Sequence, residues 1–207
     1  MPTAAKAAFD RNIQRASYFL DVHATVQAGA AGAPTLARRE LPRGAVVFAI
    51  GALDAYLSDA SAEVLIAQCE GGVMTGKTRI VMRDVSKVLP GLALELAVVP
   101  DAKERLDRLR LALTDHFQTN VSAHGPKAVA DAVERMGGVP RIIWDGLVAL
   151  GFSDPAKELD TWTDIRHRIV HRGEKPRVWR EHARECIRLL EALAAEVDQV
   201  AEAAIVE

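Results

Sequence analysis

Aromatic residues make up only 5% of this 207-residue chain, cysteine occurs twice, and uninterrupted apolar runs are short. Cys69 and Cys186 are far apart and form no C-x-x-C pair, so the sequence indicates neither a disulfide framework nor a zinc site built on cysteine. The apolar runs fall short of the roughly 18 residues that a membrane span requires. Charged residues interrupt the N-terminal region, where a signal peptide needs an apolar core. We therefore expect a cytoplasmic protein with no membrane segment.

A large net charge is also lacking, because 26 basic residues stand against 28 acidic ones. The whole molecule is therefore not a polycation that coats nucleic acid. The charge is uneven, however, since residues 161–190 contain twice as many Lys and Arg residues as Asp and Glu residues. This segment forms either one local basic face or an ordinary solvated helix surface.

Ala, Leu, Val, Glu and Arg dominate the sequence, and this mixture favours helices because Ala and the straight side chains lose little freedom there. Apolar residues recur at three-residue and four-residue spacings over residues 4–27, over about three heptads after Pro42, and over residues 178–205, a seam that includes Trp179. Thr3 is the expected cap of the first helix. The pattern predicts one all-α domain over residues 1–207, a bundle of long antiparallel helices.

The connecting segments are predicted to be shorter and less regular. Residues 29–34 form a loop, and the stretch from Gly71 to Pro100 has no clear period, with Arg79-Ile80-Val81-Met82 more typical of a strand than of a helix. A few short inserted helices are expected over residues 102–117, 126–136 and 140–150.

One further helix carries the most informative residues of the chain. Asp154-Pro155 predicts its start and Gly173 its end, and its last turns contain the hexad Arg166-His167-Arg168-Ile169-Val170-His171. Arg166 falls in the apolar stripe of this helix, so it requires a carboxylate partner such as Asp54 or a polar cleft. His171 lies about 140° around an ideal helix from Arg166. The helix end, or a second copy of the chain, must therefore bring the two side chains together.

The hexad resembles the motif of the HEPN superfamily. Arg166 and His171 match its R-x(4–6)-H signature, and His167 occupies the next position, where that family often has Asn, Asp or His. Residues 165–173 are similar to the end of the motif helix in RiboL-PSP-type HEPN domains. Two other segments resemble the helices of these domains, residues 17–23 and residues 49–56.

The resemblance implies a HEPN-like helical bundle that dimerises through its motif helices and acts as a metal-independent endoribonuclease, without a cofactor. It also implies a toxin or an antiviral defence effector that acts on RNA under the control of a cognate antitoxin or regulatory protein. The residue chemistry agrees, because attack by the 2′-hydroxyl of RNA requires a base, an acid and positive charge on the phosphorane. We expect His171 to transfer protons, Arg166 to stabilise the phosphate, and His167 to orient the site or to supply a second proton.

Three alternatives remain open from the residues. Residues 71–78, Gly-Gly-Val-Met-Thr-Gly-Lys-Thr, match the nucleotide-binding P-loop pattern, in which Lys77 contacts phosphate and Thr78 ligates magnesium. Asp164, His167 and His171 share one helical stripe, a spacing that can present three ligands to a metal ion. A HEPN fold without catalysis, serving as a binding or assembly module, is the third alternative.

Two single residues have plainer expectations. Asp54 borders the apolar seam of its helix and is either a positioning residue for Arg166 or a surface carboxylate. His23 continues an apolar face and is expected to be a hydrogen-bonded core histidine.

Overall fold

The computed structural model of the chain describes residues 2–27, 36–72, 74, 76–120 and 125–206, and every regular element in these ranges is a helix. The predicted all-α class is confirmed. The loop predicted for residues 29–34 lies outside the described residues. The helices in chain order are α1 (Ala4–Gln27), α2 (Leu36–Gly71), α3 (Gly76–Val88), α4 (Leu92–Ala97), α5 (Ala102–Asn120), α6 (Gly125–Arg135), α7 (Pro140–Ala149), α8 (Pro155–Arg172) and α9 (Arg180–Val206).

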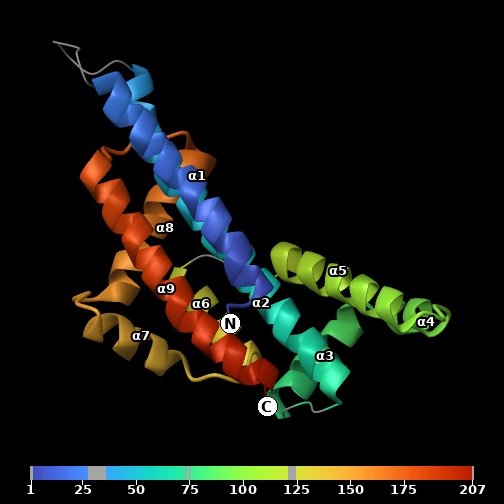
Figure 1. Ribbon diagram of the computed structural model, residues 1–207. Coiled ribbons are helices and arrows are strands. Elements are labelled where there is room, and N and C mark those ends of the chain that lie inside the picture. The colour runs from blue at the N-terminus through green and yellow to red at the C-terminus, as the bar shows by residue number, and fades with distance from the viewer. Residues whose placement is uncertain (1, 28–35, 73, 75, 121–124, 207) are drawn as a thin grey trace.

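The long helices α1, α2 and α9 pack along one another and form the main body, with α6, α7 and α8 beside them (Figure 1). The apolar seam predicted for α1 is buried in this core, as are the seams of α2 and α9. Trp179 is an exception, because it lies just before α9 and is 46% exposed. The expectation that Trp179 belongs to the seam of the last helix is therefore wrong.

A buried polar network fixes the N-terminus of α1. Thr3 caps the helix as predicted, since its Oγ1 accepts a hydrogen bond of 3.0 Å from the amide of Lys6. The same hydroxyl donates to Oδ1 of the buried Asp198 in α9 at 2.5 Å, and the Tyr56 hydroxyl of α2 donates to that oxygen at 3.4 Å. Burial raises the pKa of Tyr56, so the phenol remains a donor. One carboxylate thus ties three helices together.

Helix α2 begins at Leu36 and contains Pro42, so the expectation that it starts after Pro42 is wrong. Proline has no amide hydrogen and normally lies in the first turn of a helix. Tertiary contacts hold the additional turn here, because Arg38 is only 6% exposed and its Nη2 donates to the carbonyl of Val26 at the end of α1.

By length and composition alone, residues 38–71 of α2 are sufficiently apolar to cross a membrane, a finding that the sequence analysis did not anticipate. In the structure 67% of that apolar window is buried inside the protein, as in the core helix of a bundle. Its apolar residues therefore have helices as neighbours along most of the window.

A second apolar cluster surrounds the C-terminal part of α2, where α3, α4 and α5 extend to one side of the main body (Figure 1). Helix α3 includes Arg79–Met82, so the strand-like interpretation of these residues is wrong. The spacing of the buried positions in α3 is helical, because they recur every three or four residues. Thr78 and Val85 are buried, and Val81 and Met82 between them are partly buried. β-branched residues at positions 80 and 81 obscured this spacing.

Candidate active site

Helix α8 begins and ends where the sequence predicts. The Asp154 side chain accepts a hydrogen bond of 3.2 Å from the amide of Lys157, and Pro155 occupies the first turn. Gly173 ends the helix in the left-handed conformation, with a φ of 63°, and its amide donates to the carbonyl of Arg168. Leu159 is buried in the core, so the hexad is held on a helix that is anchored at both ends and along one face.

The structure brings Arg166, His167 and His171 together. Nη1 of Arg166 lies 3.1 Å from Nε2 of His171, and the rings of His167 and His171 have centroids 4.9 Å apart with an interplanar angle of 43°. The contact forms at the last turn of one helix, so the helix end suffices and a second copy is not needed for it. The long arginine side chain spans the 140° separation that the sequence analysis had noted.

The contact can be a hydrogen bond in one tautomer of His171. A guanidinium only donates hydrogen bonds, so the contact is a hydrogen bond when Nε2 of His171 carries its lone pair. Both His167 and His171 are exposed to solvent, whereas Arg166 is half-buried. The arrangement places two imidazoles and a guanidinium within one accessible site.

Arg168 and Arg172, the other arginines near the hexad, contact Glu174 just after the end of α8. Nε of Arg168 donates to Oε2 of Glu174 at 2.6 Å, and Nη1 of Arg172 lies 3.8 Å from Oε1 of the same residue. The hydrogen bond from Arg168 holds the pKa of Glu174 below its usual value and raises the pKa of Arg168. Arg168 is thus bound to the residue after the C-cap and is not part of the site.

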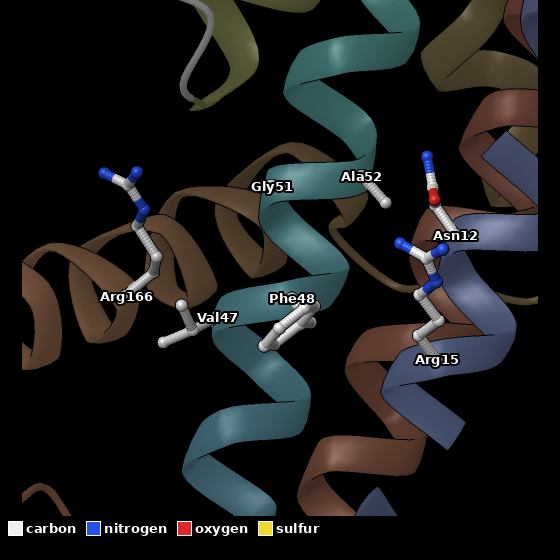
Figure 2. Close-up of a pocket in the computed structure, with 7 residues that line it drawn as sticks. All are labelled: Asn12, Arg15, Val47, Phe48, Gly51, Ala52 and Arg166. Carbon is white, nitrogen blue, oxygen red and sulfur yellow. The ribbon is translucent and has the colours of Figure 1, made fainter. Parts of the chain in front are cut away.

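A groove of about 340 Å³ begins at Arg166 and crosses the exposed face of α2 (Figure 2). Figure 2 shows Arg166 of α8 on one side of α2 and Arg15 of α1 on the other. The floor between the two guanidinium groups is largely apolar, and Phe48 within it is 48% exposed. The full lining consists of Asn12, Arg15, Val47, Phe48, Gly51, Ala52 and Arg166. Two cations over an open floor can bind two anionic groups.

Asp54 lies on the same face of α2 as the groove, because Val47, Gly51 and Asp54 are spaced by four and three residues. Its side chain is half-buried. Val47, Gly51 and Arg166 all line the groove, and Asp54 lies one turn of α2 beyond Gly51. The pairing of Asp54 with Arg166 stays a prediction.

Residues 71–78 do not have the structural surroundings of a P-loop. Of these residues, 73 and 75 lie outside the described part of the chain. The segment follows the 36-residue helix α2, whereas a P-loop follows a buried strand of a parallel sheet. Thr78 is fully buried and its hydroxyl donates to Oε1 of Gln68 at 2.6 Å. That hydroxyl is not available as a magnesium ligand in this conformation.

The proposed trio of metal ligands is not gathered around a common point. Within the described ranges, no group of three His, Cys, Asp or Glu side chains has a geometry that could hold a metal ion. Oδ2 of Asp164 lies 3.9 Å from Nη1 of Arg168, one turn along the same helix. The stripe of Asp164, His167 and His171 therefore supports imidazole chemistry better than metal ligation.

A second polar site, a pocket of about 540 Å³ lined by His23 and Trp179 among others, was not predicted from the sequence. The expectation of a hydrogen-bonded core histidine at position 23 is wrong. The buried Nδ1 of His23 has no hydrogen-bond partner within the described part of the chain. Burial and the charges of Arg180 and Arg38 lower the pKa of His23. The excess of basic residues over 161–190 was the available signal, but the contribution of α1 and α2 was not visible in it.

Comparison of the chain with protein-family models, with curated proteins and with solved structures finds no match. The function therefore has to be argued from Arg166, His167, His171 and the groove that they border. The HEPN resemblance of the hexad stays a prediction.

Proposed function

We propose that this protein is a metal-independent endoribonuclease of the HEPN type, which cleaves RNA to 2′,3′-cyclic phosphate and 5′-hydroxyl ends. The observation that carries the proposal is the contact of 3.1 Å between Nη1 of Arg166 and Nε2 of His171. An imidazole beside a guanidinium is a pair that suits this reaction, since a base must act where negative charge develops on phosphorus.

The reaction begins when a phosphate of the substrate replaces His171 as the partner of Arg166. The guanidinium fork binds phosphate oxygens better than it binds one imidazole nitrogen, because two parallel hydrogen bonds to a charged acceptor match its geometry. The exchange releases the lone pair of Nε2 on His171. That nitrogen removes the proton of the 2′-hydroxyl, and the 2′-oxygen forms a bond to phosphorus.

The bond from phosphorus to the 5′-oxygen then breaks, and the leaving oxygen takes up a proton. His167 is a source for this proton within the same chain, since its ring lies beside that of His171 with centroids 4.9 Å apart. A second copy of the chain across a two-fold axis is the other source. Arg166 neutralises the phosphorane throughout, and Arg15 is placed across the groove to bind a neighbouring phosphate.

A homodimer through the motif helices accords with the surface near the site. Val170 within the hexad is 46% exposed and Phe48 in the groove is 48% exposed. Exposed apolar side chains beside a polar site are typical of a surface that another chain covers. The proposed biological role, a toxin or defence effector held by an antitoxin or regulatory protein, rests on the HEPN resemblance alone.

The test is incubation of the purified protein with RNA in excess chelator, followed by analysis of the end groups. We expect fragments that carry 2′,3′-cyclic phosphates, and we expect Lys77→Ala to cleave like the unaltered protein. Loss of activity in Lys77→Ala together with magnesium-dependent ATP binding would favour the P-loop alternative. RNA that is bound tightly but stays intact would favour a non-catalytic binding module.

A further inference from the structure

A second pocket is lined by residues near the end of α1 and near the starts of α2 and α9, helices that Figure 1 shows. We call it the basic pocket, and its volume is about 540 Å³. Glu181 is the acidic residue in its wall. Against it stand the cations Arg38, Arg39, Lys175, Arg177 and Arg180, together with Arg43, whose charge is paired with that of Glu40. Such an accumulation of one charge in a concave site attracts anions and is unfavourable without them.

Arg43 fixes the shape of the basic pocket through hydrogen bonds from all three of its guanidinium nitrogens. Its Nε donates to the carbonyl of Pro176 at 2.7 Å, its Nη2 to the carbonyl of Lys175 at 3.0 Å, and its Nη1 to Oε1 of Glu40 at 2.7 Å. These bonds hold the segment between α8 and α9 against α2. Lys175 and Arg177 on that segment therefore have a defined position at the pocket wall.

Two other groups in the basic pocket have unused hydrogen-bonding capacity. Nδ1 of His23 and Nε of Arg180 are both buried, and neither has a hydrogen-bond partner among the residues that the structure describes. A buried polar atom without a partner is unfavourable. An anion with several acceptor oxygens satisfies both atoms at once and compensates the surrounding charge.

Trp179 adds an aromatic surface to this cationic wall. Its ring is stacked under the guanidinium of Arg177, with the Cζ atom 4.1 Å from the ring centroid, and the residue remains 46% exposed. Phosphate-binding cations next to an exposed aromatic ring are the combination that holds single-stranded nucleic acid, because the bases stack while the backbone is neutralised.

The basic pocket also lies close to the hexad along the chain. Lys175 is four residues after His171, so their Cα atoms are at most about 14 Å apart. The wall of the basic pocket at Lys175 is therefore within a few nucleotides of His171 along an extended strand.

We infer that the basic pocket is a substrate subsite that binds the backbone of single-stranded RNA, with Trp179 as the stacking platform for a base. The identity of the strand as RNA rests on the proposed ribonuclease function. The anionic character of the ligand rests on the cations and on the unsatisfied atoms of His23 and Arg180.

The first experiment measures binding of a fluorescent RNA of about twelve nucleotides to the full chain carrying His171→Ala, by anisotropy at several salt concentrations. Trp179→Ala is expected to weaken binding about 5-fold to 100-fold, the effect of one stacked base. Lys175→Ala and Arg180→Ala are each expected to lower the salt slope by about one. The matched control is Arg184→Ala, an exposed residue one turn further along α9 that does not line the pocket. Equal affinities in all four variants would overturn the inference.

A second readout follows His23 directly by NMR titration. Burial and the charges of Arg180 and Arg38 lower the pKa of His23 in the free protein, against Glu181, which raises it. The RNA is expected to raise this pKa, because phosphate charge offsets the two arginines. A pKa of His23 that stays unchanged in the complex would place the strand elsewhere.

A third experiment separates this inference from the proposed function. A dinucleotide has one phosphodiester and does not extend into the basic pocket, so Trp179→Ala and the unaltered protein are expected to cleave it equally, while the variant loses activity on the longer RNA. Equal cleavage of both substrates would remove the subsite and leave the ribonuclease intact. Binding of RNA in the basic pocket without any cleavage would remove the ribonuclease and leave the pocket.

Discussion

Replacement of His171 by alanine distinguishes two roles for this residue, because the expected fall in the cleavage rate differs between them. In the structure His171 lies 3.1 Å from Nη1 of Arg166 and its ring contacts that of His167. If His171 only positions Arg166, the loss is that of one exposed hydrogen bond, about 0.5–1.5 kcal/mol. This corresponds to at most about a tenfold fall in rate. If it transfers protons, as we propose, the rate falls about 10²-fold to 10⁴-fold.

The assay is single-turnover cleavage of RNA in chelator, with unfolding by urea measured on the same samples. His171 is exposed in the last turn of α8, so its replacement is expected to change the free energy of unfolding by less than about 1 kcal/mol. His171→Gln keeps a hydrogen-bond acceptor for Arg166 but transfers no proton, and it is expected to be as inactive as His171→Ala. The control is His182→Ala, an exposed histidine of α9. Cleavage by His171→Gln within tenfold of the unaltered rate would refute the proton-transfer role.

Three further predictions concern stability. Asp198→Ala removes the acceptor of the Thr3 hydroxyl and is expected to lower the free energy of unfolding by about 2 kcal/mol in urea denaturation. An unchanged midpoint would show that the network contributes nothing. Gly173→Ala places a Cβ at a φ of 63° and is expected to cost about 1 kcal/mol by the same measurement, and a neutral effect would mean that the end of α8 rearranges. Burial and Arg180 lower the pKa of folded His23, so the unfolded chain takes up a proton first as the pH falls through about 6.5. The melting temperature is therefore expected to fall between about pH 8 and about pH 5, and His23→Gln is expected to reduce that fall. An identical pH profile in the variant would contradict the lowered pKa.

The helices that have both a cap and an apolar period could be predicted from the sequence. Helix α1 spans Ala4–Gln27 as the spacing indicates, and Asp154 and Gly173 mark the ends of α8 because capping and the left-handed conformation are local properties of those residues. Helix α2 was predicted to start too late, because the turn before Pro42 depends on the contact of Arg38 with the carbonyl of Val26. Sequence spacing cannot reveal a contact of this kind.

The hexad was recognised as a candidate site, but its geometry was predicted only in part. Ideal helical angles separate Arg166 from His171, and the length of the arginine side chain overcomes that separation at the helix end. The basic pocket escaped notice because its cations come from α2, from the segment after α8 and from α9. Only the excess of basic residues over 161–190 pointed towards it.

The sequence by itself determined the all-α class, the buried seams of the long helices and the placement of the hexad in the last turns of α8. These properties follow from composition, from a period of three to four residues and from local caps. Tertiary structure alone decided that Thr3 meets Asp198 across 195 positions of sequence and that His23 lies among the cations of the basic pocket. Such contacts depend on how whole helices pack, and packing is set by the summed burial of many side chains rather than by any short segment.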